Sequence, residues 1–343
     1  MTQELKVGII GTGVMGQDHA RNFAAGIQGG RLVAVADVNT EAARELADSV
    51  GAEHVFADGG EMIDSGLIDA VIIAAPDRFH ADLTLRALER NLPVLCEKPL
   101  APTAEEAAAV VKREREIGEE LVTVGFMRRF DPGYLALRER LESGTDGALL
   151  MSHSIHRNVE AHPDGTSQDT VTNSGIHEID IIPWLAGSPI VRVEWKGGRP
   201  STLITKRQDP QLLLMEDANG ALHTVEVQVQ AQYGYDVRCE LVCETASIEL
   251  PRVPSLVEQQ PLFVSKDLAA VSSYPADWRP RFAAAYRAEL SAWVAAAAMK
   301  KLPEGAASAE DALRSTIVAN ALVESMHNGG IAVDVPALSE VLS

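Results

Sequence analysis

Short apolar runs alternate with amphipathic stretches through the first third of the chain. The apolar runs, which predict strands, lie at residues 5–10, 31–36, 69–75, 93–96 and 121–125. The stretches between them, which predict helices, lie at residues 17–25, 40–51, 79–90 and 103–117. Thr40 is the expected cap of the second helix, and Thr103 with Glu106 forms a capping box for the last. This alternation is typical of a parallel sheet with helices on both faces.

The pattern changes after residue 126, where longer strands with alternating or β-branched composition follow. They are expected at residues 148–155, 191–195, 222–230 and 238–244, and two loop-like segments lie at 160–168 and 251–261. Two helices, at 281–299 and 309–327, close the chain; the first carries a helically spaced set that we interpret as core, namely Phe282, Tyr286, Leu290 and Trp293. The sequence therefore predicts a doubly wound α/β domain at 1–125 and an α+β domain with a mixed or antiparallel sheet at 126–343.

Composition narrows the class of protein. With 343 residues, 46% hydrophobic and 23% charged, the chain is expected to be globular with about two domains. A formal charge of −19 argues against a nucleic-acid partner, which requires a basic surface. No apolar run approaches the roughly 18 residues of a membrane span, so we expect no membrane partner and a cytoplasmic location. Cys96, Cys239 and Cys243 lack metal-ligand spacing, so we interpret them as buried reduced thiols and expect no metal.

A glycine-rich turn, Gly11-Thr12-Gly13-Val14-Met15-Gly16, links the first strand to the first helix. Alone, this spacing is a weak signal, but its position between a strand and a helix makes it specific for a dinucleotide site. Gly11 permits the tight turn, Gly13 lets the backbone approach a pyrophosphate, and Gly16 allows close helix packing. The helix N-terminus adds backbone donors and a favourable dipole for the phosphates.

Asp37, at the end of the second strand, selects the form of the cofactor. Its carboxylate can accept hydrogen bonds from a ribose that bears both hydroxyls, and it would repel a 2′-phosphate. The following Val38 and Asn39 supply no arginine to hold such a phosphate. The sequence therefore predicts NAD rather than NADP.

The triplet Glu97-Lys98-Pro99 follows the apolar strand at 93–96 and places one lysine at a defined point. Pro99 prevents a helical continuation and biases Lys98 toward an extended backbone. Ligands of open α/β sheets bind beyond the carboxyl ends of the strands. A lysine at this point indicates an enzyme.

A second cluster of chemical groups lies in Asn173-Ser174-Gly175-Ile176-His177-Glu178-Ile179-Asp180. In a helix, His177 and Asp180 share one face at i and i+3, with Trp184 and Leu185 on the apolar side. Histidine is the usual proton acceptor near neutral pH, and a carboxylate beside it raises its basicity. A single histidine is more often structural, but the presence of Lys98 favours a catalytic role for His177.

These motifs resemble those of the glucose-fructose oxidoreductase, inositol dehydrogenase and MocA family. The resemblance rests on the glycine turn, Ala74-Ala75-Pro76-Asp77 with His80, the Glu97-Lys98-Pro99 triplet and His177 with Asp180. Further segments resemble the bacterial inositol 2-dehydrogenase branch, namely residues 125–131, 156–158 and 233–240, and Arg281-Phe282 with Tyr286, Glu289, Leu290 and Trp293.

The resemblance implies an N-terminal Rossmann domain and a C-terminal domain with a large open, mostly antiparallel sheet that often supports dimers or tetramers. It implies NAD-linked oxidation of a ring secondary alcohol in a small polyol or sugar, with His177 as base and Lys98 stabilising the alkoxide. The implied cofactor-binding residues are Gly11, Thr12, Gly13, Val14, Met15, Gly16, Asp37, Val38, Ala75, Pro76, His80, Glu97 and Lys98. The substrate-binding candidates, by resemblance and position, are Arg128, His156, Asn158, Thr172 and Tyr235. Arg128 could equally be a structural ion-pair residue, and Tyr235 could be part of the sheet core.

One residue departs from the pattern of inositol dehydrogenases, which usually place an aspartate four residues before the catalytic histidine. This chain has Asn173 there. An amide can orient the ring but carries no charge to stabilise an imidazolium. We expect a weaker base or a shifted substrate preference, with Asp180 supplying charge.

Other functions stay open from the sequence. The resemblance also covers pyranose dehydrogenases, glycosidases that use NAD without net redox change, and sensors that bind NAD and a sugar. Sensors are expected to lack the lysine, whereas Lys98 and His177 are both present. Cyclitol oxidation is therefore the leading hypothesis, and sugar oxidation is the main alternative.

Overall fold

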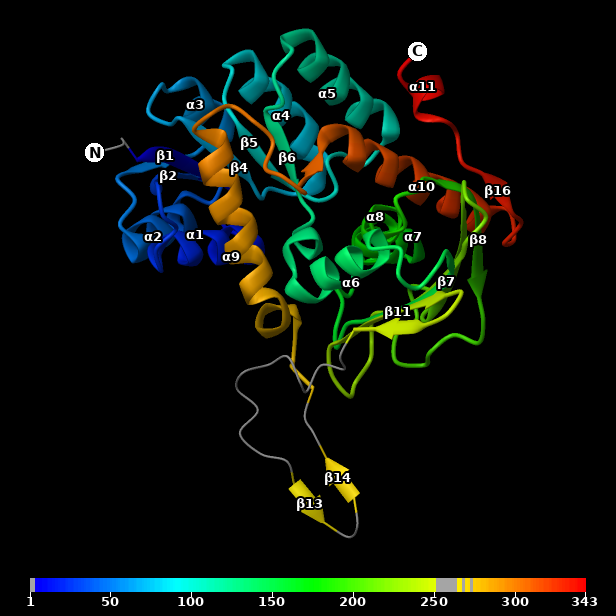
Figure 1. The fold of residues 1–343 in the computed structure, drawn as a ribbon. Coiled ribbons are helices and arrows are strands. Elements are labelled where there is room, and N and C mark those ends of the chain that lie inside the picture. The colour runs from blue at the N-terminus through cyan, green and yellow to red at the C-terminus, as the bar shows by residue number, and fades with distance from the viewer. Residues whose placement is uncertain (1–3, 251–263, 267–268, 272–273) are drawn as a thin grey trace. The chain divides into compact units, whose positions relative to one another are not determined.

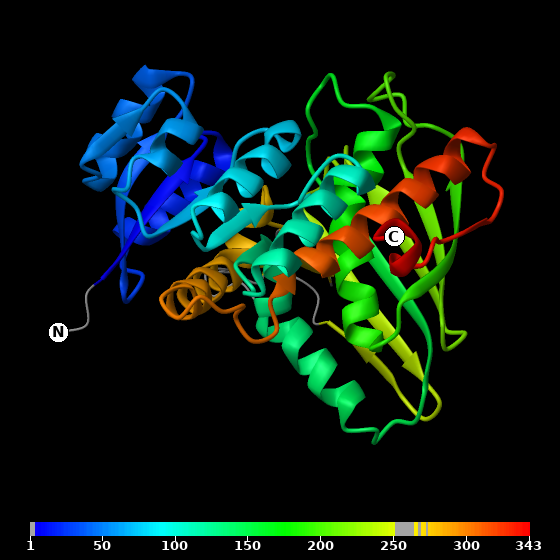
Figure 2. The ribbon, with the colours of Figure 1, turned by 90° about the horizontal axis from the view of Figure 1, so that it is seen from above.

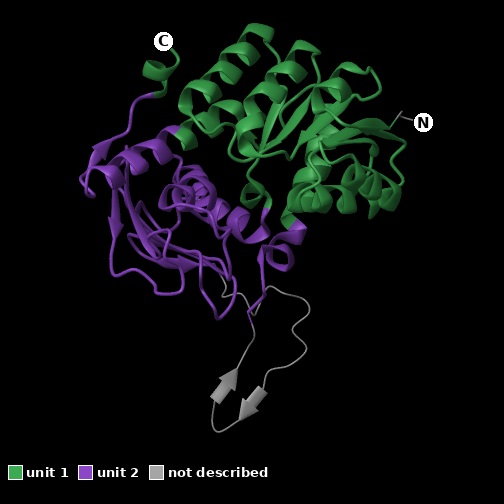
Figure 3. Cartoon of the chain, turned by 180° about the vertical axis from the view of Figure 1, so that it is seen from behind, with its two compact units in different colours: residues 1–130, 285–316, 338–343 green, residues 131–284, 317–337 purple. Residues whose placement is uncertain are grey.

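The computed structural model describes residues 4–250, 264–266, 269–271 and 274–343. Within them the chain forms two compact units (Figure 3). Unit 1 comprises residues 1–130, 285–316 and 338–343, and unit 2 comprises residues 131–284 and 317–337. Each unit has its own sheet. The loop predicted at 251–261 lies outside the described residues.

The sheet of unit 1 is a seven-stranded sheet in the order β15-β6-β5-β4-β1-β2-β3. Its strands are β1 (Leu5–Ile10), β2 (Gly30–Ala36), β3 (His54–Phe56), β4 (Ala70–Ile73), β5 (Val94–Glu97), β6 (Val122–Gly125) and β15 (Ala307–Ser308). Neighbouring strands are parallel except for β15, which pairs antiparallel with β6. The order reverses between β1 and β4, which is the switch point where such sheets bind dinucleotides.

Helices cover both faces of this sheet, as the alternating pattern predicted (Figure 1). One face carries α3 (Gly59–Asp64), α4 (His80–Glu89) and α5 (Ala104–Ile117); the other carries α1 (Val14–Ala24), α2 (Thr40–Val50) and part of α9 (Trp278–Ala297). Leu290 and Trp293 of α9 are buried with Val7 and Ile9 of β1, which confirms that these helix residues belong to a core. The short helices η1 (Asp77–Phe79), η2 (Met127–Phe130) and α11 (Leu338–Val341) complete the unit.

Of the two predicted helix N-caps, one is confirmed and the other is wrong. Thr103 and Glu106 form the predicted capping box of α5. The cap of α2 is Asn39 rather than Thr40, because the Asn39 side chain accepts a hydrogen bond from the Ala42 N–H and Thr40 is already helical. An asparagine is at least as good an N-cap as a threonine, so the helix begins one residue earlier than predicted.

Unit 2 contains a second seven-stranded sheet, in the order β12-β11-β7-β10-β9-β8-β16. Its strands are β7 (Leu149–Arg157), β8 (Ile190–Gly197), β9 (Gln211–Asp217), β10 (Leu222–Gln228), β11 (Asp236–Cys243), β12 (Ser247–Glu249) and β16 (Val333–Asp334). Only β7 and β10 pair in parallel, so this sheet is mostly antiparallel as expected. Alternate residues of β9, β10 and β11 are buried, which leaves one face of each strand against the core.

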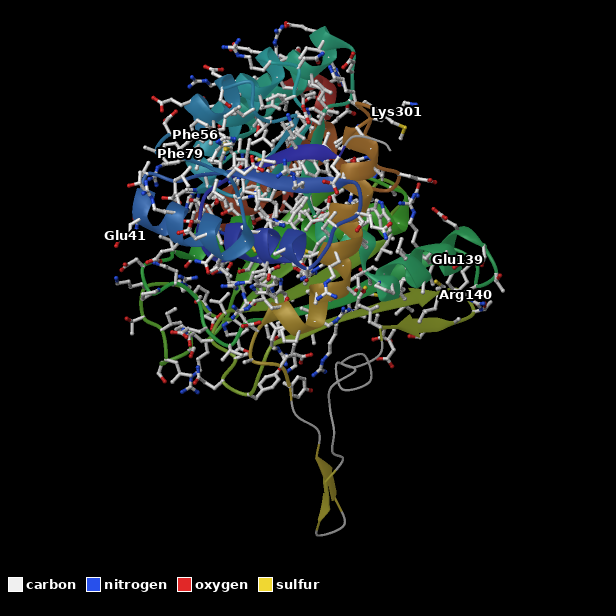
Figure 4. All side chains as sticks on the ribbon, turned by 90° about the vertical axis from the view of Figure 1, so that its left-hand side faces the viewer. Glu41, Phe56, Phe79, Glu139, Arg140 and Lys301 are labelled. Carbon is white, nitrogen blue, oxygen red and sulfur yellow. The ribbon has the colours of Figure 1, made fainter. Side chains whose placement is uncertain are left out.

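Helices of unit 2 lie on one face of that sheet, with α8 against β7 (Figure 2). They are α6 (Pro132–Glu142), α7 (Ser167–Asp169), a π-helix at Thr170–Gly175, α8 (Ile176–Ala186) and part of α10 (Ala309–His327). Arg140 of α6, labelled in Figure 4, donates from Nε and Nη2 to the carboxylate oxygens of Asp146 at 2.5 and 2.8 Å. Outside both sheets, β13 (Val264–Lys266) pairs with β14 (Ala269–Val271). The three cysteines are buried thiols, as predicted.

A buried ion pair joins α6 to α9 within unit 2. Arg281 donates from Nη1 and Nη2 to the two carboxylate oxygens of Asp131, at 2.5 and 3.2 Å, and both side chains are 4% exposed. Asp131 also caps α6 by accepting from the N–H groups of Gly133 and Tyr134. The pair therefore fixes the start of α6.

Removing the cation should leave Asp131 buried without its ion-pair partner. We expect Arg281→Met to lower the free energy of unfolding of unit 2 by about 3–5 kcal/mol, measured by denaturant titration. The matched control is Arg279→Met, which breaks the more exposed pair with Asp277 and should cost less than about 1 kcal/mol. Equal small losses in both variants would show that the buried pair does not stabilise the fold.

Candidate active site

The glycine turn is closely packed on its inner side and open on its outer side. A Cβ on Gly11 would lie 2.3 Å from the Ala74 carbonyl oxygen, and Gly11 has φ +99°. A Cβ on Gly16 would lie 1.9 Å from the Gly11 carbonyl oxygen. Gly13 is exposed, and a Cβ there would meet nothing within 4 Å. Gly11 and Gly16 thus shape the turn, while Gly13 leaves room at the start of α1 for a ligand.

Asp37 is held in place by the backbone around the turn. Its Oδ2 accepts from the Thr12 N–H and hydroxyl, both at 2.8 Å, and its Oδ1 accepts from the Asn39 N–H at 2.8 Å. A carboxylate offers about four acceptor positions, so Asp37 can still accept from a ribose hydroxyl. Val38 beside it is 91% exposed. The glycine turn and Asp37 fit a dinucleotide with a free 2′-hydroxyl.

Neutralising Asp37 should weaken the preference between the two cofactors. Asp37→Asn keeps an acceptor for Thr12 but removes the charge that repels a 2′-phosphate. We expect the ratio of kcat/KM for NAD over NADP to fall at least about tenfold, or about 1.4 kcal/mol. Steady-state kinetics with both cofactors measures this ratio, and exposed Asp48→Asn in α2 is the control. An unchanged ratio would show that Asp37 does not discriminate.

Glu97 is a buried carboxylate at the end of β5, and its environment keeps it charged. Its Oε1 lies 2.8 Å from His19 Nε2, and its Oε2 accepts from the Lys98 N–H at 3.3 Å. Burial raises the pKa of this carboxyl, but the hydrogen bond to His19 and the charges of His19, Lys98 and His80 outweigh burial, so that the pKa lies below its usual value. Glu97 therefore supplies a fixed negative charge beside Lys98.

Lys98 follows Glu97 at the carboxyl edge of the sheet and is partly buried. Burial lowers the pKa of its ammonium, the charges of Glu97 and Asp77 oppose that effect, and the charge of Arg128 adds to it. The net result is a lysine that releases its proton more readily than a free one. Such a group can donate a strong hydrogen bond to a developing oxyanion.

His80, which opens α4, connects two turns at the same edge. Its Nδ1 lies 2.7 Å from the Pro99 carbonyl oxygen, and its Nε2 lies 2.8 Å from the Ala75 carbonyl oxygen. Both ring nitrogens are thus occupied by the backbone of the turns that follow β5 and β4. Ala75 is partly buried and Pro76 is exposed.

Unit 2 brings a second group of candidate residues together. His177 lies in the first turn of α8 and His156 near the end of β7, with their ring centroids 5.9 Å apart. Tyr235 packs edge-on to His156 at 6.2 Å, and His156 Nδ1 lies 2.9 Å from Oε2 of Glu178. All four side chains are buried. An imidazole can accept a proton near neutral pH, and a carboxylate and a phenol beside it can form hydrogen bonds with ligand hydroxyls.

The other candidates on unit 2 lie in and around the helix. Asp180 is buried three residues after His177, as the helical spacing predicted. Asn173 is exposed in the π-helix, and the Thr172 hydroxyl donates to the Gln168 carbonyl oxygen at 3.2 Å. Asn158 Nδ2 lies 3.4 Å from the Ser174 hydroxyl, which places it beside the same helix. Arg128 belongs to unit 1, where it is 1% exposed.

Sequence reasoning missed two features of these groups. Glu178 had no assigned role, although its position directly after His177 could have indicated a residue of the same site. The π-helix before His177 was not expected. A π-helical turn inside a helix is often found at functional sites.

Among the described residues, no helix is both long and apolar enough to cross a membrane, and no three His, Cys, Asp or Glu side chains gather as a metal site would need.

Two family models match most of the chain, and known relatives match nearly all of it. A family described as an oxidoreductase family with an NAD-binding Rossmann fold matches residues 5–126, and the GFO/IDH/MocA C-terminal domain matches residues 134–249. Inositol 2-dehydrogenase 2 of Paenarthrobacter aurescens is 43% identical over 331 residues, covering 95% of this chain and 97% of the relative. Inositol 2-dehydrogenase 1 of Saccharopolyspora erythraea is 41% identical over 327 residues, covering 95% of each.

Solved structures show the same relationship. The myo-inositol dehydrogenase of Lactobacillus casei, crystallised with NAD(H) and myo-inositol, has a TM-score of 0.92 at 30% identity over 98% of both chains. The scyllo-inositol dehydrogenase of the same organism, with NAD(H) and scyllo-inositol, has a TM-score of 0.87 at 25% identity over 97% of this chain and 99% of the other. The fold and both family matches lead to one conclusion: the chain belongs to the glucose-fructose oxidoreductase, inositol dehydrogenase and MocA family of NAD-dependent oxidoreductases.

Proposed function

We propose that this protein oxidises a ring secondary alcohol of an inositol to the corresponding inosose with NAD. The observation that carries this proposal is the 43% identity to an inositol 2-dehydrogenase over 95% of the chain. The residues are compatible with it, because the described chain offers a candidate for each group that the reaction needs. We further propose that residues 1–125 bind NAD, and that residues 126–343 bind the substrate and form a homo-oligomer.

When bound, NAD would supply the electron sink for the hydride of the carbinol carbon. The glycine turn would hold its pyrophosphate, and Asp37 would hold the adenine ribose. Glu97 and Lys98, with the turn that carries Ala75 and Pro76, would lie toward the nicotinamide end. The strand order supports this assignment of residues to the two ends of the cofactor. β2, which carries Asp37 at its end, lies on one side of the switch point, and β4 and β5 lie on the other side.

The hydroxyl proton needs an acceptor as the carbonyl forms, and His177 is proposed for this role. The alkoxide character that develops on the oxygen needs a donor, and Lys98 is proposed for that role. The hydroxyl oxygen thus loses its proton to His177, the carbon loses its hydride, and a carbonyl remains. Arg128, His156, Asn158, Thr172 and Tyr235 are proposed to hold the remaining ring hydroxyls.

Product analysis tests the reaction itself. Incubation of the purified protein with NAD and myo-inositol should yield a ketone lighter than the substrate by two hydrogen atoms, detected by mass spectrometry after carbonyl trapping. A product of unchanged mass, or release of an aglycone from an aryl glycoside without accumulation of reduced cofactor, would instead support a redox-neutral reaction.

Asn173 gives a test of the charge around the proposed base. A carboxylate one helical turn before His177 stabilises the imidazolium, so Asn173→Asp should raise kcat several-fold. Because the base then stays protonated to higher pH, the acid limb of the kcat profile should move upward by up to about one pH unit. Exposed Asn328→Asp is the control. A rate and pH profile identical to the unmodified enzyme would show that charge at position 173 does not act on the base.

A further inference from the structure

His80 makes two hydrogen bonds that a neutral ring cannot make together. Its side chain is buried at 1% exposure, and its two ring nitrogens face the carbonyl oxygens of Pro99 and Ala75 at 2.7 and 2.8 Å. Carbonyl oxygens only accept, and a neutral imidazole has only one N–H. A neutral ring would therefore turn a lone pair toward a buried carbonyl oxygen. The imidazolium, with two N–H groups, satisfies both acceptors.

The charges around His80 are compatible with a buried cation. Burial by itself lowers the pKa of the ring, but the interaction with Cys96 and the two carbonyl hydrogen bonds raise it to about 10. Glu97, on the same strand as Cys96, interacts electrostatically with His80, and this interaction is one of the causes that lower the pKa of Glu97. The geometry and the neighbouring carboxylate therefore point to the same protonation state.

The two carbonyl groups belong to two different turns, one after β4 and one after β5. Ala75 lies in the turn after β4, and Pro99 directly follows Lys98 in the turn after β5. β4 and β5 are neighbouring parallel strands, so the two turns leave the sheet at the same edge. A ring that donates to both fixes the backbone on each side, and with it the point from which the Lys98 side chain departs.

We propose that His80 is a constantly protonated imidazolium that ties the Ala75 turn to the Lys98–Pro99 turn and is a positioning residue for Lys98. It acts through the backbone of these turns rather than on the substrate. The positioning part rests on the function proposed above for Lys98. The charged state of the ring stands independently of that function.

The charge is tested by nitrogen NMR of the ¹⁵N-histidine-labelled protein. At about pH 8, well above the ordinary histidine pKa of about 6.5, we expect one histidine to keep both ring nitrogens protonated. Its signals should disappear in His80→Asn and remain in His153→Asn, an exposed histidine of β7. If His80→Asn does not fold, His80→Gln and assignment of the other histidines by substitution identify the signal. A His80 signal with one unprotonated nitrogen at this pH overturns the proposal.

The positioning role is tested by a double-mutant cycle with Lys98→Met, which retains the length of the side chain. His80→Asn alone should lower kcat by about 10–100-fold, because a small displacement of a catalytic group has effects of that size. In the Lys98→Met background the same change should lower kcat by no more than about twofold, since the group it positions is gone. Equal losses in both backgrounds would show a general structural effect and overturn the positioning role.

The two measurements separate this proposal from the function on which its second part rests. If the unmodified enzyme oxidises no inositol, the same cycle is measured on any alcohol that it does oxidise, and the NMR result still decides the charge. If inositol is oxidised but the ring is neutral, the proposed function stands and the imidazolium does not.

Discussion

Lys98→Met should lower kcat for inositol oxidation by about 10²–10³-fold, the loss seen when one donor to a developing oxyanion is removed. Methionine keeps the unbranched length of the side chain but cannot donate a hydrogen bond. NAD affinity should change no more than about threefold, because the pyrophosphate and ribose contacts are assigned to other residues. Steady-state kinetics and cofactor fluorescence titration measure the two effects separately.

The pH profile adds a readout specific to the ammonium. Because burial lowers the pKa of Lys98, the rate of the unmodified enzyme should fall on the alkaline side at a lower pH than for a free lysine. This limb should be absent in Lys98→Met. Lys112→Met, at an exposed position of α5, should leave rate and profile unchanged. If Lys98→Met retains the full rate, the oxyanion role is wrong.

His177→Asn should lower kcat by about 10²–10⁴-fold, the range that general base catalysis contributes. The amide can still donate and accept hydrogen bonds, so the substrate should bind with similar affinity while its proton has no acceptor. The acid limb of the pH profile, where the base becomes protonated, should vanish together with the rate. Rapid-mixing measurements of a single turnover distinguish a slow chemical step from slow product release.

The control for this variant is His153→Asn, because His153 is exposed on β7 and its Nδ1 lies 2.8 Å from the Thr224 hydroxyl. Its kinetics should equal those of the unmodified enzyme. A His177→Asn enzyme that keeps its acid limb would show that another group takes the proton. His156, with its ring 5.9 Å from that of His177, would then be the next candidate.

Much of unit 1 could be predicted because its signals are local. The strand at residues 5–10 and the capping box of Thr103 with Glu106 depend on neighbouring residues, and both are confirmed. The helix at 309–327 also has the predicted bounds, with Ser308 accepting from the Asp311 N–H. By contrast, β15 at 307–308 joins the edge of a sheet formed by residues far earlier in the chain. Two residues carry no pattern that could predict such pairing.

The sheet of unit 2 was predicted in kind but not in detail. The strand β9 was missed because Leu212, Leu213, Leu214 and Met215 form a continuous apolar run rather than an alternating one, and such runs do not distinguish strand from helix. The parallel pairing of β7 with β10 depends on tertiary contacts that no local pattern specifies. The sequence therefore predicted a mostly antiparallel sheet, but it could not predict which strands are neighbours.

For the candidate residues, the sequence suggested types of chemistry but not the contact partners. Lys98 and His177 were proposed from their motifs, and their roles stay predictions. The contacts of His156 with Glu178 and of His19 with Glu97 join residues 22 and 78 positions apart, and only the folded chain shows them. The same holds for His80, whose two acceptors are backbone atoms that have no signature in the side-chain sequence.

The measurement that tests the central claim most directly is reduced-nicotinamide absorbance during incubation with NAD and a panel of ring polyols. The panel contains myo-, scyllo- and chiro-inositol and common aldoses, and Lys98→Met serves as the inactive control. Inositol oxidation by NAD predicts a rise in absorbance with at least one inositol that the Lys98 variant does not give. A rise with aldoses alone, or none with any compound despite NAD binding, would contradict it.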